Sequence, residues 1–300
     1  MKLRNLGQSS IKLSEISLGA MSLLQGDGSN NQYIIDQAKD IGINYIDTSD
    51  LYDHGQNEVL LGTLLKSQRK DWKIGSKVGN RWKEDGSGWE WVPSKAYIIS
   101  AVEKSLMRLQ TDYLDLYQLH GGMIEDPIEE IIEAFDLLKS QGKILEYGLS
   151  SIRPQVFKKY AEISSIQSNM MQFSLLDRRP EEYLSFLESC HISVLARGTI
   201  AQGLLIDKPA KNYLNRGLAD VALIQEAFKK LANQLGVTQL AVALQYPLIH
   251  RTVCSSIVGI RNIQQMKDLK IAIDELNQIP EQCYVEILND IPSNFYQDYR

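Results

Sequence analysis

The sequence predicts an α/β protein built as a (β/α)8 barrel, also called a TIM barrel. Short segments rich in branched and aromatic residues alternate with amphipathic segments along the chain, as expected where strands alternate with helices. Eight such strands can be placed, which is the number that a closed barrel requires. The chain has 300 residues, modestly more than the ~250 typical of one such barrel. We therefore expect a single barrel domain over residues 1–300 with short additions at its ends.

The elements are expected in the following order. Residues 2–15 predict a short N-terminal β-hairpin, with a turn at Gly7, that caps the floor of the barrel. The eight barrel strands are expected at residues 16–20, 43–47, 73–78, 113–120, 144–149, 168–172, 192–196 and 254–258. Amphipathic helices are expected between them, among others at residues 31–41, 95–109, 127–140 and 221–235.

Signals at the ends of these segments agree with the expected boundaries. Ser94 is suited to cap the helix that follows it, Pro127 stands at a helix start, and Gly142 follows a helix end. Residues 279–300 are expected to form a helical tail. Its aromatic side chains either fold back on the barrel or form a contact surface; they are Phe295, Tyr296 and Tyr299.

Two stretches depart from the short connections that are usual in this fold. Residues 79–93 form a long glycine-rich loop that carries Trp82, Trp89 and Trp91, three of the four tryptophans. These aromatic side chains can bind substrate by lining an apolar pocket, or they can pack the loop against the barrel. Residues 203–220 follow the seventh strand and either fold over a cofactor or form a surface loop.

Composition argues against several classes of protein. Apolar residues make up 44% of the chain and charged residues 23%, which is typical of a soluble globular protein. The net charge of −5 argues against nucleic acid or an anionic membrane as the main partner. Cys190, Cys254 and Cys283 are widely spaced, which predicts structural thiols and no metal site. Because no segment resembles a signal peptide or approaches the ~20 apolar residues of a membrane span, we expect a cytoplasmic protein.

Four ionisable residues lie at or just beyond the ends of predicted strands: Asp47, Tyr52, Lys77 and His120. The two-residue period of a strand assigns Asp47, Lys77 and His120 to one face of their respective strands. In a barrel, the carboxyl ends of the strands and the loops after them form one rim. We therefore expect the four side chains to meet in one pocket.

An aspartate, a lysine and a histidine around a phenol can deliver a proton to a substrate. A phenol is a weak acid near neutral pH, and an ammonium beside it favours its ionised form. Lys77 can supply this charge, and Asp47 is its expected counter-ion, because a charge in a partly dry pocket is costly without a partner. His120 can hydrogen-bond a substrate oxygen or relay a proton to Tyr52. Together they would polarise a carbonyl group and protonate the alkoxide that forms when hydride arrives.

Each of these residues also has a purely structural interpretation. Asp47 and Lys77 can form a structural ion pair, Tyr52 can be a packing residue, and His120 can be a half-buried histidine with satisfied hydrogen bonds. Their common position at one barrel rim favours the catalytic interpretation of the set.

Five motifs resemble those of the aldo-keto reductases, in the same order along the chain: IDTSDLYDHGQNE, the lysine of KIGSKVG, YLDLYQLH, GKILEYGLSS and SIVGIRNIQQM. The resemblance covers nearly the whole chain. It implies a TIM-barrel oxidoreductase that transfers hydride from NADPH to a small aldehyde or ketone. It also implies that Tyr52 is the general acid, that Asp47 and Lys77 tune it, and that His120 orients the carbonyl.

A cofactor is needed because no side chain supplies hydride. The chain has no G-x-G-x-x-G motif, so a Rossmann site is not supported. A phosphate site after the last strands is common in TIM barrels. There Gly259 allows close backbone approach, Asn262 can cap the next helix, and Arg261 can bind a phosphate, which favours NADPH over NADH. The resemblance places Arg261 and Gln265 at the 2′-phosphate end; the alternative is an exposed arginine. Leu269 stands where an asparagine is usual in the family.

The resemblance implies further cofactor contacts. Ser150 or Ser151 and Gln172 would hold the nicotinamide carboxamide, and Asp47 would lie beside the cofactor. The loop after the seventh strand would place Arg197, Gly198, Gln202, Gly203 and Leu204 near the pyrophosphate. Gly19, Ala20 and Met21 resemble the turn beneath the nicotinamide, and core packing is the alternative for Met21. The alternatives for Arg197 are the pyrophosphate, the substrate, or an acid such as Asp177.

Two other functions compete with carbonyl reduction. A hydrolase could use paired carboxylates, Asp47 with Asp50 or Glu58, but it has no use for Tyr52 and Lys77 in register. A barrel of this kind could also bind NADPH as a redox sensor or regulatory subunit, as potassium-channel β subunits of the same superfamily do. The presence of all four catalytic residue types favours turnover. We expect a monomer or a weak homo-oligomer.

Overall fold

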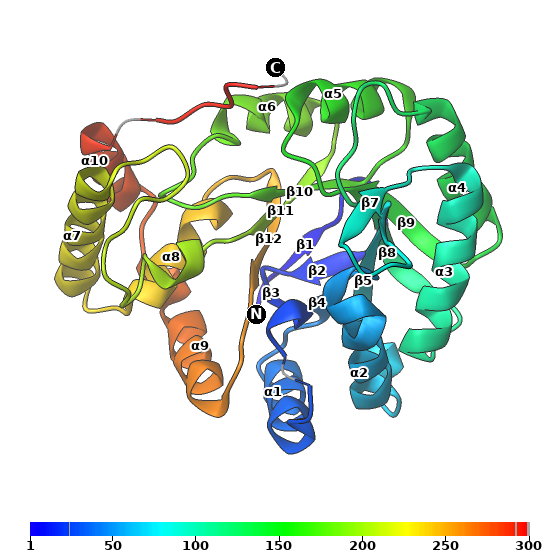
Figure 1. Ribbon diagram of the computed structural model, residues 1–300. Coiled ribbons are helices and arrows are strands. Elements are labelled where there is room, and N and C mark those ends of the chain that lie inside the picture. The colour runs from blue at the N-terminus through cyan, green and yellow to red at the C-terminus, as the bar shows by residue number, and fades with distance from the viewer. Residues whose placement is uncertain (24, 292, 299–300) are drawn as a thin grey trace.

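Eight parallel strands close into a barrel at the centre of the computed structural model (Figure 1). The structure describes residues 1–23, 25–291 and 293–298. The barrel strands are β3 (Ile16–Gly19), β4 (Tyr45–Asp47), β5 (Lys73–Val78), β8 (Leu114–Leu119), β9 (Ile144–Leu149), β10 (Ser168–Gln172), β11 (Ser193–Arg197) and β12 (Val253–Val258). Their order around the barrel follows the chain, and β12 pairs with β3 to close it. The predicted fold class is therefore confirmed.

Helices surround the barrel (Figure 1). They are α1 (Gly28–Asp40), α2 (Gln56–Leu65), α3 (Lys95–Leu109), α4 (Ile128–Ser140), α5 (Pro154–Ile163), α6 (Glu181–Ser189), α7 (Leu218–Leu235), α8 (Gln239–Leu248) and α9 (Ile263–Glu275). Short 3-10 helices occur at η1 (Ala20–Ser22), η2 (Tyr52–Gly55), η3 (Arg69–Asp71), η4 (Ala201–Gly203) and η5 (Leu276–Gln278). The predicted cap of α3 is confirmed, because the Ser94 hydroxyl accepts a hydrogen bond from the Tyr97 N–H at 3.3 Å. Within the described residues, none of the helices has the length and apolar character needed to cross a membrane.

The predicted N-terminal hairpin is also confirmed. It consists of β1 (Leu3–Asn5) and β2 (Lys12–Ser14), which pair antiparallel. Leu6, Ile11 and Leu13 are buried and cluster with side chains of the barrel interior, among them Tyr45 and Leu116. Burial of this apolar surface holds the hairpin in place.

Inside the barrel, Gly75 makes room for the ring of Tyr45. A Cβ atom at residue 75 would lie 2.0 Å from the Tyr45 hydroxyl oxygen, and Tyr45 is fully buried. We expect Gly75→Ala to lower the free energy of unfolding by roughly 1–3 kcal/mol, the usual cost of overpacking. Urea denaturation measures this, with Gly28→Ala as the control, because a Cβ at Gly28 meets nothing within 4 Å. Equal stability of the two variants would show that the Tyr45 ring does not depend on the space left by Gly75.

Residues 79–93, expected as a long glycine-rich loop, contain a β-hairpin. Its strands, β6 (Asn80–Trp82) and β7 (Trp89–Trp91), pair antiparallel and set Trp82 opposite Trp89. Aromatic pairs across strands stabilise such a ribbon. Gly86 and Gly88 have φ of 72° and 132° and supply the left-handed backbone that the turn requires.

Among the described residues of the segment 279–300, helix occurs only in α10 (Gln282–Asp290). The chain then runs past α6 without forming helix or strand in its described residues (Figure 1). Asn294 accepts a hydrogen bond from the Arg178 N–H at 2.7 Å, and the ring of Tyr296 lies 4.7 Å from the Arg179 guanidinium. The tail therefore folds back on the barrel. Phe295 is exposed, and Tyr299 lies outside the described residues.

Candidate active site

The ends of β4 and β5 bring a buried carboxylate against a buried ammonium. The Lys77 Nζ atom donates to Asp47 Oδ2 at 2.5 Å, to the Thr48 carbonyl oxygen at 2.8 Å and to the Tyr52 hydroxyl oxygen at 3.3 Å. Gln118 on β8 donates to the other Asp47 oxygen at 3.4 Å. Since all three ammonium hydrogens have acceptors, Lys77 is held in one orientation.

The charges of this pair oppose the effect of burial. Burial alone would lower the pKa of Lys77, but the Asp47 carboxylate and the Tyr52 hydroxyl hold it above its usual value. Burial raises the pKa of Asp47, and the Lys77 ammonium opposes that rise. Lys77 therefore remains an ammonium beside the phenol of Tyr52.

Tyr52 lies on a strained turn that the β6–β7 hairpin holds. The next two residues, Asp53 and His54, have φ of 47° and 52°, a backbone conformation that costs energy outside glycine. The Trp82 indole N–H donates to the Leu51 carbonyl oxygen at 3.0 Å, and its ring stacks on His54 at 3.8 Å. The hairpin thereby fixes the position of Tyr52 on the rim.

His120 follows β8 and faces the same place. Its backbone N–H donates to the Val78 carbonyl oxygen at 2.8 Å, which extends the pairing with β5. Its ring lies edge-on to Tyr52, with 6.1 Å between the centroids, and its Nδ1 atom lies 3.2 Å from Ser49 Oγ. Burial, together with the charges of Lys77 and Arg197, lowers the pKa of His120 to about 3. The imidazole is therefore neutral near pH 7 and carries a single ring N–H.

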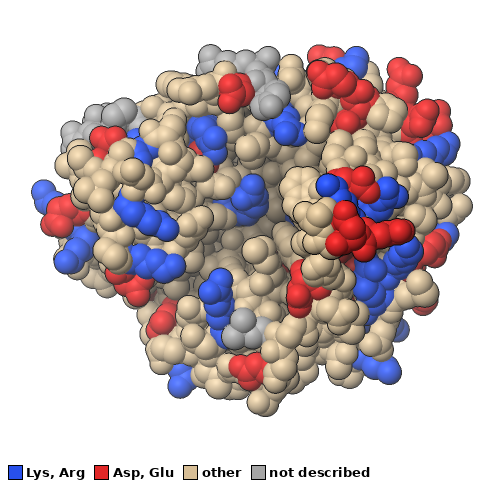
Figure 2. All heavy atoms as spheres, in the orientation of Figure 1, with Lys and Arg blue, Asp and Glu red and all other residues tan. Residues whose placement is uncertain are grey.

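The structure thus brings Asp47, Tyr52, Lys77 and His120 together at the carboxyl ends of the barrel strands. Figure 2 shows a hollow at the centre of this face, with basic side chains inside it and at its edge. An ammonium-tuned phenol beside a neutral imidazole can donate a proton to an oxygen bound in this hollow.

Gln172, at the end of β10, is held by two neighbours. Its Nε2 atom donates to the Tyr213 hydroxyl oxygen at 2.7 Å, and its Oε1 atom accepts from Arg197 at 3.2 Å. The segment 203–220 therefore reaches back over the barrel rim through Tyr213. The alternative that Arg197 forms an ion pair with Asp177 is wrong. The Arg179 guanidinium donates hydrogen bonds of 2.7 Å to both carboxylate oxygens of Asp177.

The two serines after β9 differ in exposure. Ser150 is half-buried, and its N–H donates to the Leu119 carbonyl oxygen at 2.9 Å. Ser151 is buried, and its Oγ accepts from the Arg153 N–H at 3.3 Å, just before α5. Ser150 is therefore the more exposed of the two.

Residues 19–21 form the rim after β3. Ala20 is buried, and its carbonyl oxygen accepts from Asn57 at 2.8 Å. The alternative that Met21 packs in the core is wrong, because its exposed fraction is 71%. Met21 is instead available to a molecule bound on this face.

The loop after β11 has an unusual backbone. Gly198, Gln202 and Gly203 have φ of 67°, 59° and 93°. Leu204 is buried, and its backbone N–H donates to the Ala201 carbonyl oxygen at 3.1 Å. Thr199 is fully buried, and its hydroxyl finds no hydrogen-bond partner among the described residues. This loop therefore combines bent backbone with an unsatisfied hydroxyl.

The start of α9 has the features of a phosphate site. Asn262 caps the helix, because its Oδ1 accepts from the Gln265 N–H at 2.9 Å. Gln265 in turn accepts from the Arg261 N–H at 2.9 Å. The Arg261 side chain is exposed, and a Cβ at Gly259 would lie 2.0 Å from Ser22 Oγ. Leu269 is fully buried and belongs to the core.

The three tryptophans of the hairpin lie in different surroundings. Trp82 contacts the Tyr52 turn, as described above. Trp91 donates to Asp126 at 2.9 Å and packs the hairpin on the barrel. Trp89 is exposed over 54% of its surface. Trp82 is therefore the one best placed to meet a substrate.

Sequence reasoning did not single out Gln118, Ser49 or Tyr213. Gln118 lies two residues before His120 and Ser49 two residues after Asp47, so the strand period was an available signal for both. Tyr213 had none, because it meets Gln172 across 41 residues of chain.

Comparison with known proteins decides the family. Residues 15–287 match the model of the Aldo/keto reductase family. The chain belongs to this family. It is similar to the uncharacterized oxidoreductase YqkF of Bacillus subtilis (strain 168), with 48% identity over 278 residues, which are 89% of this chain and 90% of the relative.

Other known proteins are also similar to this chain. The solved holo form of aldo-keto reductase AKR11C1 from Bacillus halodurans has a TM-score of 0.94 at 43% identity and covers 100% of this chain and 99% of its own. The apo form of AKR11C1 has a TM-score of 0.86 at 40% identity and the same coverage. The NADH-specific methylglyoxal reductase of Escherichia coli (strain K12) is 30% identical over 225 residues, 72% of this chain and 73% of the relative.

Proposed function

We propose that this aldo/keto reductase reduces aldehydes or ketones to alcohols with hydride from NADPH. The observation that supports this most directly is the Lys77 ammonium, which lies 3.3 Å from the Tyr52 hydroxyl and 2.5 Å from Asp47. A phenol so placed can release its proton to a nearby oxygen, because the ammonium stabilises the phenolate that remains.

Four residues carry the proton transfer. His120, which is neutral, donates its ring N–H to the substrate carbonyl oxygen and orients it. Tyr52 passes its hydroxyl proton to that oxygen as negative charge develops there. Lys77 stabilises the phenolate, and Asp47 keeps Lys77 charged and in place. Bound NADPH would supply the hydride.

Residues along the rim fit such a cofactor. The nicotinamide would meet Gly19, Ala20, Met21, Asp47, Ser150, Ser151 and Gln172. The pyrophosphate would meet Arg197, Gly198, Gln202, Gly203 and Leu204, where the Thr199 hydroxyl lacks a partner among the described residues. The 2′-phosphate would meet Gly259, Arg261 and Gln265 at the start of α9. The greater similarity to the holo form than to the apo form of AKR11C1 supports a chain shaped to bind its cofactor.

The carbonyl substrate would lie between Tyr52 and the β6–β7 hairpin. There it would meet Trp82, with Trp89 and Trp91 further along the same hairpin. Because the hairpin also fixes the Tyr52 turn, it would position both the wall of the substrate site and the general acid, Tyr52.

A panel of aldehydes and ketones tests the proposal. We expect the pure protein to oxidise NADPH when reactive aldehydes are added, with loss of the absorbance of the reduced nicotinamide. Binding of NADPH without turnover of any carbonyl compound would instead indicate a redox sensor or regulatory subunit.

Cofactor preference depends on Arg261. A charge-assisted hydrogen bond contributes ~1.5–3 kcal/mol, so Arg261→Ala should weaken NADPH binding by roughly ten- to a hundredfold. NADH affinity should hardly change, because NADH lacks the 2′-phosphate. Fluorescence titration with both cofactors measures this. The control is Arg251→Ala, which removes an exposed arginine just before the start of β12, at the other end of this strand from Arg261. An equal loss of affinity for both cofactors in Arg261→Ala would show that Arg261 does not bind the 2′-phosphate.

A further inference from the structure

The hydroxyl of Ser49 lies between His120 and Asp50. Its Oγ atom is 3.2 Å from His120 Nδ1 and 3.2 Å from Asp50 Oδ1. It also accepts the Leu51 N–H at 3.1 Å. Among the described residues, the other ring nitrogen of His120, Nε2, has no hydrogen-bond partner.

Ser49 has one hydroxyl hydrogen, so it cannot donate to both neighbours. When Asp50 is ionised, the carboxylate takes this hydrogen, because charge-assisted hydrogen bonds are roughly twice as strong as neutral ones. His120 must then donate its own proton from Nδ1 to Ser49. Nε2 is left with a lone pair, which can accept a hydrogen bond but cannot donate one.

Protonation of Asp50 reverses the two hydrogen bonds that Ser49 makes with Asp50 and with His120. The Asp50 carboxyl then donates to Ser49 Oγ, whose two lone pairs are filled by Asp50 and Leu51. The Ser49 hydrogen turns to His120 Nδ1, and the single imidazole proton resides on Nε2. The site gains one proton in total, at Asp50, and His120 stays neutral in both states.

We propose that Asp50, acting through Ser49, determines which ring nitrogen of His120 carries the proton. Ser49 and Asp50 are thus positioning residues for the contact between His120 and the substrate oxygen. This inference rests on the proposed role of His120 in carbonyl reduction. Donation to a carbonyl oxygen requires the proton on Nε2, whereas acceptance from an alcohol hydroxyl requires the proton on Nδ1.

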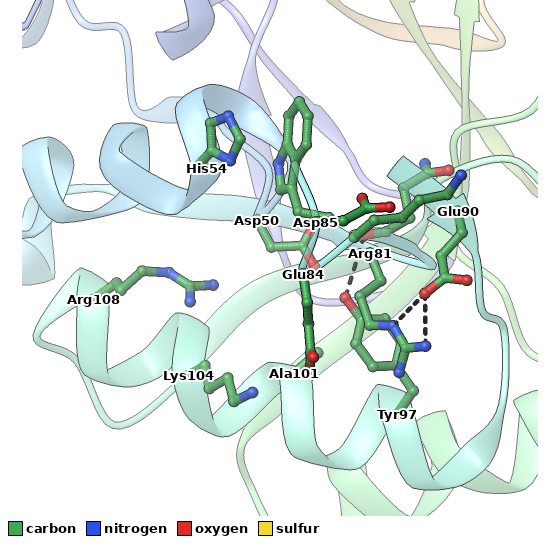
Figure 3. A pocket seen from close by; sticks show the side chains of 13 residues that line it. Asp50, His54, Arg81, Glu84, Asp85, Glu90, Tyr97, Ala101, Lys104 and Arg108 are labelled. Atoms are coloured by element: carbon green, nitrogen blue, oxygen red, sulfur yellow. Dashed lines mark hydrogen bonds and ion pairs between the residues drawn. The ribbon is translucent and has the colours of Figure 1, made fainter. Parts of the chain in front are cut away.

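Asp50 exchanges its proton through a cavity of its own. It lines a hollow of about 630 Å³ between α3 and the β6–β7 hairpin, and Figure 3 shows Lys104 and Arg108 reaching into this hollow from α3. The exposed side chains of Lys83, Glu84 and Asp85 lie along its wall. Water can therefore reach Asp50 without passing between Tyr52 and His120.

The groups around Asp50 explain its proton affinity. Burial, followed by the charge of Glu58 on α2, raises the pKa of Asp50 to about 7, and Arg108 on α3 opposes this. Arg108 is engaged by Glu58, at 2.6 Å, and Asp50 has no ion pair among the described residues. Tyr97 on α3 and Tyr117 on β8 also face Asp50. The remaining charged or titratable groups of the cavity are His54 on η2, Lys104 on α3, and Arg81, Lys83, Glu84, Asp85 and Glu90 in the hairpin.

The direction of the pH dependence follows. Below the pKa of Asp50, the carboxyl is protonated and Nε2 of His120 is a donor, which suits carbonyl reduction. Above it, Nε2 is an acceptor, which suits alcohol oxidation. We expect kcat/KM for reduction to fall on the order of tenfold as pH rises through the transition, which corresponds to the loss of one hydrogen bond to the substrate oxygen.

Nitrogen NMR of the whole 300-residue chain, labelled in its four histidines, tests this without any turnover. The chemical shifts of the ring nitrogens show which one is protonated, and His120→Asn identifies the signals of residue 120. We expect protonated Nε2 near roughly pH 5.5 and protonated Nδ1 near roughly pH 8.5, on either side of the pKa of about 7 of Asp50. Asp50→Asn, which cannot ionise, should remove this exchange of positions.

The matched control is Asp53→Asn, which alters an exposed carboxylate of the same turn and should leave the exchange intact. Ser49→Ala should abolish the response of His120 to pH in the same spectra. Absence of the exchange in the wild type, or its persistence in Asp50→Asn, would overturn the inference. Absence of carbonyl turnover with the exchange present would instead count against the proposed function alone.

Discussion

Replacement of Tyr52 by phenylalanine is expected to reduce kcat for carbonyl reduction by roughly 10²- to 10⁴-fold, the usual contribution of a positioned general acid. Phenylalanine keeps the ring that faces the Lys77 ammonium, at 4.9 Å from Nζ to the centroid, and removes only the hydroxyl. The protein should therefore fold normally. Steady-state kinetics with NADPH and a reactive aldehyde measures the loss.

Cofactor affinity separates this effect from a general disturbance of the site. It should stay within about twofold of the wild type, since a hydroxyl that acts only in the chemical step adds nothing to ground-state binding. Tyr33→Phe, on the half-buried face of α1, is the matched control and should change neither quantity. Turnover by Tyr52→Phe close to that of the wild type would assign the acid to another residue.

The barrel was predictable because its signals are local. The period of two in each strand and the caps of the helices are encoded within a few residues. Knowledge of the fold then placed Asp47, Lys77 and His120 on one rim, since the carboxyl ends of parallel strands meet there. The geometry of the Asp47 and Lys77 contact follows from this register.

Other features depend on contacts that no local pattern reveals. The hairpin of residues 79–93 is stabilised by Trp82 opposite Trp89 and by a hydrogen bond from Trp82 to Leu51. Because the local sequence does not reveal these contacts, the length and glycine content of the segment suggested a loop. The contact of Ser49 with His120 joins residues 71 positions apart. The effect of this contact on His120 depends on whether Asp50 or His120 accepts the single hydroxyl hydrogen of Ser49. That outcome depends on differences in distance of a few tenths of an ångström.

Replacement of Lys77 by methionine is expected to remove turnover and to lower the free energy of unfolding by roughly 3–5 kcal/mol at neutral pH, because it leaves the buried carboxylate of Asp47 without its counter-ion. Lys77 and Asp47 have exposed side-chain fractions of 1% and 6%, so water cannot replace the lost contact. Methionine has a similar length and no charge. Urea denaturation and aldehyde reduction measure the two effects.

The loss of stability should depend on pH in a specific direction. Burial already raises the pKa of Asp47, and Lys77 opposes that rise, so the variant should raise it further. A carboxyl whose pKa is higher in the folded than in the unfolded state binds more protons when folded, and stability falls as pH rises from the unfolded value, about 3.9, towards the folded one. Lys77→Met should therefore be less destabilised near roughly pH 5 than near roughly pH 8.

The double variant Asp47→Asn/Lys77→Met isolates the charge from the shape of the site. It has no carboxylate at residue 47, so most of the stability should return and the added dependence on pH should disappear. Turnover should stay absent, because the ammonium that stabilises the Tyr52 phenolate is still missing. A single variant as stable as the wild type at every pH would show that Asp47 and Lys77 are not a desolvated ion pair. A double variant that reduces aldehydes at the wild-type rate would show that Tyr52 releases its proton without help from Lys77.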